Sequence, residues 1–273
     1  MGKNVLYKDN MIGLLRKLIA NRNLLKNLVI RDLKHRYVGS FGGFLWSVIH
    51  PLVSFVSYAF VFSIIMKVQL GPDFGTDSYA IFFFCGFLPW FLFSDTVMRN
   101  CNVVSDNAPL ITKTIIPPEI LPISITVSNF VHHLIGLSIL LVVMAMFYSV
   151  HLSALWIVLY LGMTLMLAQG LGWIVAGLHV FVRDTIQALQ ILMFLWFWFT
   201  PVLYPLNRLP PEYRTYAEFN PMAIIVTGYR NSLLHLAQPD FSKVAIVFAA
   251  SVGIFVIGAV LFRQAKPAFP DVL

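Results

Sequence analysis

The sequence predicts an all-α integral membrane protein with six transmembrane helices and both termini in the cytoplasm. Residues 120–182 contain no Asp, Glu, Lys or Arg. As one helix rising about 1.5 Å per residue, this stretch would measure about 95 Å, roughly three bilayer cores, so it has to fold back on itself. The whole chain is 59% hydrophobic and 11% charged, whereas soluble proteins carry about 25% charged residues.

Six charge-poor stretches account for the predicted spans. They are residues 44–66, 79–94 with an extension toward 100, 119–148, 154–181, 185–207 and 244–262. The turn between the third and fourth spans is expected near 149–153, a polar cluster within the charge-free stretch. The predicted domains are a cytoplasmic N-terminal region 1–43, a single transmembrane domain 44–263 and a cytoplasmic tail 264–273.

The distribution of basic residues sets the orientation. With six spans both termini lie on one side, and that side carries fourteen of the 19 Lys and Arg residues, which makes it the cytoplasmic side. Residues 1–43 carry nine of them and contain no apolar signal sequence, so the first span is expected to be retained. Attraction to anionic lipid headgroups then explains the net charge of +7, and no nucleic acid partner is expected.

An amphipathic helix is expected at 24–37, on the cytoplasmic surface of the membrane. Apolar side chains recur there at helical spacing, and basic side chains occupy the other faces. The apolar positions are Leu25, Leu28, Val29, Leu33 and Tyr37, and the basic ones are Lys26, Arg31, Lys34 and Arg36. The alternative is a simple basic anchor without a defined role.

Two connecting segments carry further structure. In the cytoplasmic loop 101–118, Ser105 or Asp106 is expected to cap a short helix with Pro109 near its start. The prolines at 117–118 end this helix, which suits docking of a soluble partner, although a plain connector also carries prolines. The external stretch 205–240 contains an apolar run at 222–236 that is too short and polar to span, and it is interpreted as re-entrant or interfacial.

The sequence contains no catalytic or metal-binding motif. It lacks the P-loop GxxxxGK[ST] and the patterns HExxH, CxxC and GxSxG. Cys85 and Cys101 are interpreted as free thiols. His132 and His133 are adjacent and so point at different helix faces, which makes poor metal geometry. The scattered His50, His151 and His179 are interpreted as hydrogen-bonded helix or interface residues rather than ligands. Asp95 is expected to pair with Arg99 at i,i+4 near a span end. Without a mid-membrane charge for ion coupling, the chain lacks a visible energy source of its own.

Aromatic side chains gather in the first, second and fifth predicted spans. Aromatic rings can stack on the faces of sugars, so a passage lined in this way suits a polyhydroxyl chain. The alternative is that these rings fill lipid-facing positions and belt the headgroup zone. The candidates are Trp46, Phe55, Tyr58, Phe62, Trp196, Trp198, Phe199 and Tyr204.

Several motifs, in order along nearly the whole chain, resemble the ABC-2 type transporter permeases that export lipid-linked polysaccharide: O-antigen, capsule or teichoic acid. Residues 29–37 read VIRDLKHRY, followed by Gly39-Ser40, Trp46 and Pro51-Leu52. The later motifs are FVRD at 181–184, TPVLYP at 200–205, NPM at 220–222 with GYR at 228–230, and FPDVL at 269–273. His50 departs from the pattern, since the family more often has Asn there.

The resemblance implies an assembly in the bacterial cytoplasmic membrane. Two copies of this chain would join two copies of an ATP-hydrolysing subunit, which would bind the ATP and Mg²⁺, so this chain would hold no cofactor and would not be an enzyme by itself. The cargo would be an undecaprenyl-pyrophosphate-linked polysaccharide, with O-antigen as the first expectation. Alternatives of other classes are a self-contained secondary carrier and a membrane-embedded glycan-processing enzyme. Within the same class, the alternative is a drug or small-lipid exporter of the same architecture.

The resemblance also assigns roles to residues. Spans one and five would line a channel with the eight aromatic candidates. The coupling-helix candidates, which would contact the ATPase, are Asp106, Leu110, Ile111, Lys113 and Ile116. The candidates for a gate at the outer mouth are Asn220, Pro221, Tyr229 and Arg230. Arg31, Lys34 and Arg36 are candidates to attract the pyrophosphate, in competition with simple attraction to lipid headgroups.

Overall fold

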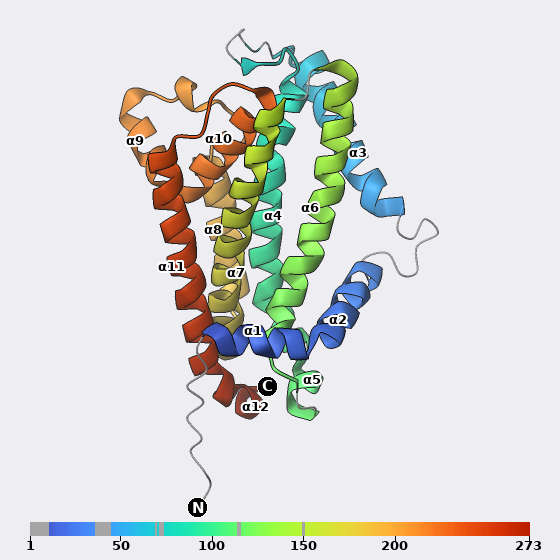
Figure 1. Cartoon of the computed structure of the whole chain (residues 1–273), viewed down its shortest axis with the longest axis vertical. Helices are drawn as coiled ribbons and strands as arrows, with labels where there is room; N and C mark the ends of the chain where they lie inside the picture. Colours follow the sequence, from blue (N-terminus) through green and yellow to red (C-terminus); the bar gives the residue numbers. More distant parts are fainter. Residues whose placement is uncertain (1–10, 36–44, 69, 71–73, 114–115, 149–150) are drawn as a thin grey trace, which may run out of the picture.

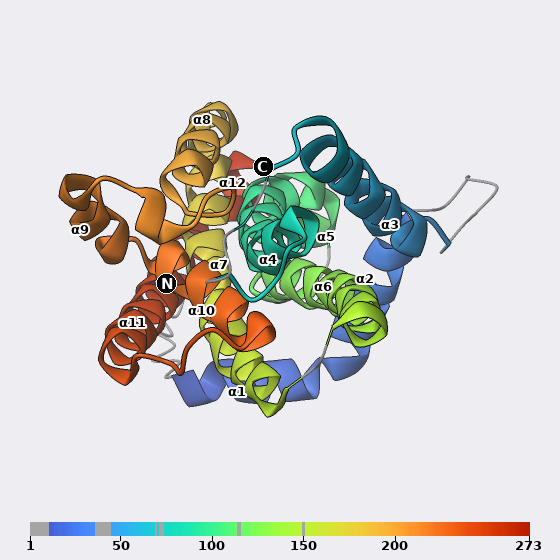
Figure 2. The same ribbon diagram turned by 90° about the horizontal axis from the view of Figure 1, so that it is seen from above.

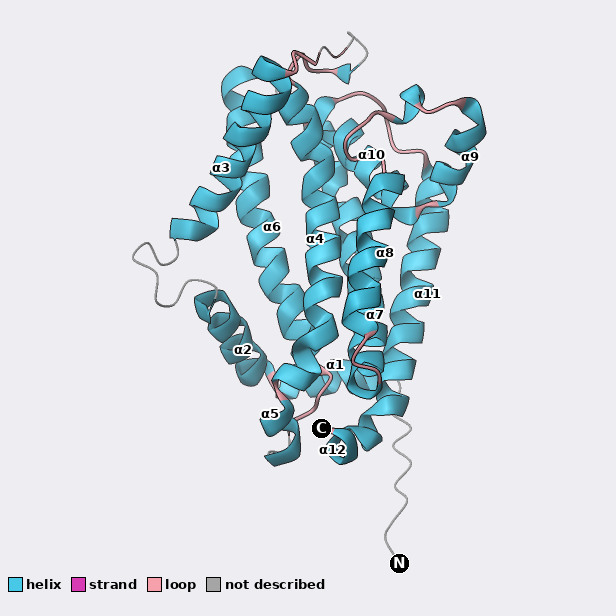
Figure 3. Cartoon of the chain, turned by 180° about the vertical axis from the view of Figure 1, so that it is seen from behind, coloured by secondary structure: helices cyan, strands magenta, loops and turns pink. Residues whose placement is uncertain are grey.

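The computed structural model describes residues 11–35, 45–68, 70, 74–113, 116–148 and 151–273. Every regular element in these ranges is a helix (Figure 3), so the all-α prediction is confirmed. Long helices stand side by side, and short helices lie at both ends of the bundle (Figure 1).

Four helices in the described ranges are long and apolar enough to cross a membrane. They are α4 (Tyr79–Asp106), α6 (Ile120–Phe147), α7 (Ile157–Phe181), which the 3₁₀ turn Leu152–Trp156 precedes, and α11 (Phe241–Ala265). The shortest of them has 25 residues and rises about 37 Å, more than the ~30 Å of a hydrocarbon core. The predicted second, third, fourth and sixth spans are therefore present as helices.

The two remaining predicted spans correspond to shorter apolar helices. Helix α3 (Trp46–Ala59) continues into a π-helical segment, Phe60–Ile65, and α8 covers Thr185–Phe199. The predicted end of the fifth span at residue 207 is wrong. The backbone leaves the helical region at Thr200, with ψ at 130°, because the residue before a proline, here Pro201, is disfavoured in the α conformation. A count of six spans stays a prediction.

Helix α4 is longer than the sequence indicates. It runs through Asp95 and Arg99 and ends only at Asp106, because the charge of Arg99 is paired with Asp32 and does not end the helix. At 28 residues it rises about 42 Å, so roughly a third of it projects beyond a hydrocarbon core.

The short helices separate into two groups (Figure 1). Helices α1 (Met11–Ala20), α2 (Arg22–His35), α5 (Ala108–Lys113) and α12 (Phe269–Val272) lie at one end of the bundle. Helices α9 (Pro211–Phe219) and α10 (Pro221–Leu234) lie at the other end. A helix, α2, is present at the predicted amphipathic segment, while its place on the membrane surface stays a prediction. Arg36 and Tyr37 lie outside the described residues. The segments expected in the cytoplasm thus share one end.

The core lies around α4, which α3, α6, α7, α8 and α10 contact, as Figure 2 shows from above. Helices α7 and α11 approach each other most closely at two glycines. A Cβ atom on Gly258 would lie 2.1 Å from the carbonyl oxygen of Gly170. Small residues at such crossings let membrane helices pack backbone against backbone.

Candidate functional site

Aromatic side chains of α3 and the following π-helical segment pack against α4. Three ring pairs join these elements, with centroids 4.5 to 4.8 Å apart: Phe55 with Phe84, Tyr58 with Phe83, and Phe62 with Tyr79. The three candidates Phe55, Tyr58 and Phe62 are half-buried, and Trp46, at the start of α3, is exposed.

The candidates on α8 divide into a packed residue and exposed ones. Trp196 is half-buried. Its indole N–H donates to Asn220 Oδ1 at 2.9 Å, and its ring centroid lies 5.0 Å from that of Phe93. Two candidates are exposed, Trp198 at 51% and Phe199 at 71%. Tyr204, beyond the end of α8, donates its hydroxyl to the Trp198 carbonyl at 2.8 Å.

Helix α4 stands between the two aromatic groups (Figure 2). Phe83 and Phe84 contact α3, whereas Trp90 and Phe93 contact α8. Within the described residues, the candidates therefore form an aromatic surface across three helices rather than the wall of an enclosed passage. A passage requires a second surface to face this one.

Asn220 links the turn after α8 to the start of α10. Its Oδ1 accepts the backbone N–H of Met222 at 3.0 Å, as an N-cap residue does, and its Nδ2 donates to Thr200 Oγ1 at 3.0 Å. Pro221 occupies the first helical position, where a missing N–H costs nothing. The apolar run at 222–236 is thus mostly helical, while a re-entrant position in a membrane stays a prediction.

The other two gate candidates face the interior. Arg230 is 3% exposed, and Tyr229 is completely buried, with its hydroxyl 3.0 Å from Nε2 of His133 on α6. The guanidinium of Arg230 donates to three backbone carbonyls, those of Phe82 at 3.2 Å, Pro201 at 3.1 Å and Val202 at 2.9 Å. Both residues hold α10 against the bundle.

At the opposite end, α5 follows α4 after a single residue, Asn107. The predicted cap at Ser105 or Asp106 is wrong, since both residues belong to the last turn of α4. Their place is taken by Asn107, whose backbone carbonyl accepts the N–H of Leu110 at 2.9 Å. Helix α5 therefore begins about two residues later than the sequence indicates.

The coupling candidates do not share one face of α5. Ile111 is only 9% exposed and belongs to a buried cluster with Leu28 of α2, Phe262 of α11 and Phe269 of α12. It therefore anchors α5 to the bundle and is not available on the surface. Leu110 and Ile116 are half-buried, Lys113 is the last residue of α5, and the exposed residues here are Asp106, Pro109 and Thr112.

Helix α2 is joined to the bundle by polar contacts. Asp32 forms an ion pair with Arg99 of α4 and accepts a hydrogen bond from Ser128 of α6. Arg99 also donates to Asn129 Oδ1 at 2.8 Å. The sequence contains no signal for a partner 67 residues away, and the expected pairing of Arg99 with Asp95 stays a prediction. Of the pyrophosphate candidates, Arg31 and Lys34 are exposed on α2, and Arg36 lies outside the described residues.

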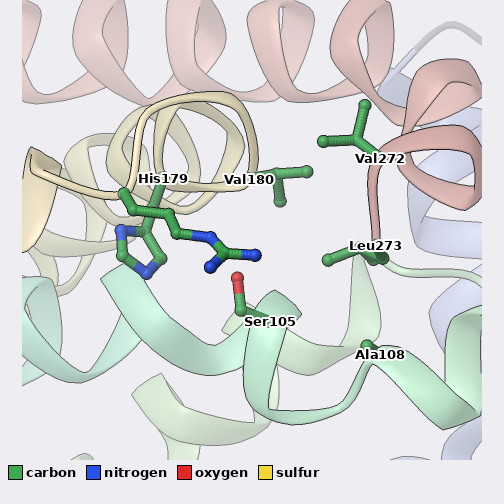
Figure 4. A pocket seen from close by; sticks show the side chains of 7 residues that line it. Ser105, Ala108, His179, Val180, Val272 and Leu273 are labelled. Atoms are coloured by element: carbon green, nitrogen blue, oxygen red, sulfur yellow. The ribbon is translucent and has the colours of Figure 1, made fainter.

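A cavity of about 220 Å³ lies between α5, the end of α7 and the C-terminal residues. Figure 4 shows Ser105 of α4 and His179 of α7 on its walls, opposite Val272. Arg183, from the FVRD motif, also lines it. The cavity thus combines hydroxyl, imidazole and guanidinium groups with apolar side chains beside the predicted coupling helix.

The residues that the sequence left without a role are partly or fully buried. Asp32, Ser128, Asn107 and Phe82 make the contacts just described, and only Asp32 lies in a motif. Both cysteines are free and buried, as predicted. Among the described residues, no three His, Cys, Asp or Glu side chains are grouped to hold a metal ion.

Comparison with known proteins places these features in context. Residues 23–234 match the model of the family described as ABC-2 type transporter. The chain is 33% identical over 267 residues to the O-antigen export system permease protein RfbA of Myxococcus xanthus, covering 96% of this chain and 99% of that protein.

Two further relatives are more distant. An O-antigen export system permease protein RfbA of Klebsiella pneumoniae is 26% identical over 92% of this chain and 95% of its own length. The polysialic acid transport protein KpsM of Escherichia coli is 26% identical over 76% of this chain and 80% of its own length.

Proposed function

Because this chain belongs to the ABC-2 type transporter family, we propose that it is the permease subunit of an ATP-driven exporter of O-antigen. It is a multi-pass protein of the bacterial inner membrane. The cargo is a polysaccharide carried on undecaprenyl pyrophosphate, which crosses from the cytoplasmic side to the outer side.

One observation carries this proposal: the end-to-end similarity to an O-antigen export permease, which covers 99% of that relative. A similarity of this extent relates whole architectures rather than one shared helix. The more distant similarity to a polysialic acid transport protein supports capsular polysaccharide as the second candidate cargo, and teichoic acid remains a third.

The channel is proposed to form between two copies of the chain. Each copy contributes the aromatic surface of α3, α4 and α8, and the second copy supplies the facing wall that one chain lacks. Exposed rings such as Trp46, Trp198 and Phe199 are then the ones that meet sugar faces. The rings of Phe55, Tyr58 and Phe62 are half-buried against α4, and their exposed sides line the passage.

The driving force is proposed to come from two copies of a separate ATPase, which bind ATP and Mg²⁺. The contact with this partner is made by Asp106 at the end of α4 and by Pro109 and Thr112 of α5, while Ile111 holds α5 in place. Helices α9 and α10 form the outer gate. Lys34 and Arg36 remain candidates to attract the pyrophosphate, together with the free side of the Arg31 guanidinium.

Deletion of the gene in a bacterium that carries it tests the proposal. Surface polysaccharide attached to lipid A should be lost, and undecaprenyl-pyrophosphate-linked glycan should accumulate in the cytoplasmic membrane. A plasmid copy should reverse both effects. Retention of normal lipid A-linked glycan, with loss of capsule instead, would move the assignment to the second candidate.

A second measurement separates the exporter from a self-contained carrier. The purified chain, reconstituted in vesicles without an ATPase, should transport no solute in response to an ion gradient. Flux under these conditions would contradict the proposal, whatever the deletion shows.

A further inference from the structure

Helix α2 is fixed to the bundle by more than membrane attraction. Leu28 is 5% exposed and packs in the cluster that includes Ile111. Asp32 bridges α4 and α6 through Arg99 and Ser128, and the side chains of this ion pair are only 16% and 27% exposed. A helix held by headgroups alone has no need of a partly buried carboxylate, so α2 is a defined part of the bundle.

Asn107 is the single residue at which α4 ends and α5 begins, and every polar group of its side chain is used. Its Nδ2 donates to the Val103 carbonyl in the last turn of α4, at 2.8 Å. Its Oδ1 accepts from Nη2 of Arg31 on α2, also at 2.8 Å. Its backbone carbonyl accepts the first hydrogen bond of α5. Three helices therefore meet at one amide.

Helix α5 depends on such contacts for its direction. With six residues it is far shorter than the roughly 12–15 residues at which isolated helices become marginally stable in water. Ile111 fixes its inner face, and rotation about the Asn107 junction would change the angle at which the helix projects. The bond from Arg31 restricts this rotation.

We propose that Arg31 is a positioning residue for energy coupling: it holds the Asn107 junction and so fixes α5 at the angle at which the ATPase engages it. This inference rests on the proposed function. It gives Arg31 a role distinct from attraction of the pyrophosphate, because the guanidinium that was a candidate for the anion is bound to an amide of α4. Motion of α5 during the ATPase cycle then reaches α2 through this bond.

Lys34 provides a matched control. It lies one turn further along α2, is exposed like Arg31 and carries the same charge. If α2 acted on α5 only through its positive charge, Arg31→Ala and Lys34→Ala would have equal effects on the position of α5. If the hydrogen bond at the Asn107 junction fixes that position, only Arg31→Ala and Asn107→Ala disturb it.

Hydrogen exchange on the purified permease, without ATPase or glycan, tests the junction itself. The amides of Leu110, Ile111 and Thr112 should exchange about fivefold faster in Arg31→Ala and in Asn107→Ala, the effect of losing one partly exposed hydrogen bond. The double variant should be no faster than Asn107→Ala alone, because Arg31→Ala removes a bond that Asn107→Ala already lacks. Lys34→Ala should match the wild type, and equal rates in all five proteins would overturn the inference.

Transport with the ATPase present tests the consequence. Glycan exported per ATP hydrolysed should fall about fivefold in Arg31→Ala, whereas the stability of the complex should not change. The ratio should also stay unchanged in Lys26→Ala, at an exposed residue of α2 that has no role in the proposed function. Arg31→Lys should restore part of the ratio, since an ammonium still reaches the amide oxygen. A loss in Lys26→Ala equal to that in Arg31→Ala would overturn the inference. A wild-type permease that exports no glycan would instead overturn the proposed function, a result that the exchange rates do not depend on.

Discussion

The guanidinium of Arg230 lies 3.7 Å from the centroid of the Phe82 ring, a cation–π contact between α10 and α4. The same guanidinium donates to the Phe82 carbonyl and to two carbonyls in the turn after α8. A buried cation is costly unless its donors are paired. Arg230 is therefore a fixed joint between α10, α4 and the end of α8.

Arg230→Lys should destabilise the protein by about 2–3 kcal/mol, the range for hydrogen bonds to charged groups. A lysine ammonium is a point donor and cannot reach three carbonyls as the planar fork does. Thermal unfolding of the purified protein in detergent measures the effect. Arg22→Lys, at an exposed arginine of α2, should change stability by no more than about 0.5 kcal/mol.

Gly86→Ala provides a second test of the same joint without removing the charge. A Cβ at residue 86 would lie 2.5 Å from Nη2 of Arg230, so the guanidinium has to move. Gly162→Ala, where a Cβ meets nothing within 4 Å, is the control. Equal unfolding temperatures for the two alanine variants would show that the position of Arg230 is not critical.

The crossing of α7 and α11 should be sensitive to one methyl group. Gly258→Ala places a Cβ 2.1 Å from the backbone oxygen of Gly170, which cannot rotate away, and overpacking of this kind costs about 1–3 kcal/mol. Gly253→Ala, on the same helix with open space around its Cβ, should be neutral or slightly stabilising. The yield and unfolding temperature of the two variants check this difference, and similar values would contradict the observed approach.

Asp240 should stabilise the start of α11 at neutral pH. Its Oδ1 accepts from the Ser242 hydroxyl and from the backbone N–H groups of Ser242 and Lys243, and these bonds, the hydroxyl first, lower the pKa of the carboxyl below 3.8. A lowered pKa means that the stabilisation is complete above the unfolded-state pKa and is lost as pH falls through the folded-state pKa.

Asp240→Ala should therefore unfold at a lower temperature than the wild type by a constant margin between about pH 5 and 8. The margin should close below pH 3.8. Asp240→Asn keeps an acceptor of similar capping strength and should stay close to the wild type throughout the neutral range. A margin that varies between pH 5 and 8 would mean that another group titrates with the cap.

The sequence predicts the long helices well and the junctions poorly, for a physical reason. Helices α6 and α7 follow from hydropathy alone, because a charge-free stretch has few other folds in lipid. The pairing of Arg99 with Asp32 joins residues 67 positions apart, and local spacing contains no information about it. The burial of Ile111 likewise depends on α2, α11 and α12. Because the sequence does not show these neighbours, an apolar residue on a short loop helix is interpreted as a docking contact.

The two faces of α5 should respond differently to a carboxylate. Ile111→Asp buries an unpaired charge in the cluster with Leu28 and Phe262 and should destabilise the permease itself by several kcal/mol, seen as a lower unfolding temperature. Thr112→Asp lies on the exposed side and should leave that temperature unchanged while weakening co-purification of the ATPase. Normal ATPase binding in Thr112→Asp would remove the exposed face from the proposed contact.

Trp196 and Trp198, two positions apart on α8, should separate packing from transport. Trp196 donates to Asn220 and packs on Phe93. Trp196→Ala should therefore destabilise the permease by about 3–5 kcal/mol, which lowers the abundance of the folded protein. Trp198 is 51% exposed, and Trp198→Ala should leave abundance unchanged while slowing glycan export about threefold to tenfold, the value of a lost aromatic contact. Quantitative immunoblotting of the permease, alongside the rate at which glycan appears on the cell surface, measures both effects. Export per folded permease that is unchanged in Trp198→Ala would mean that this ring faces lipid and not the cargo, and the proposed channel surface would then have to exclude the outer end of α8.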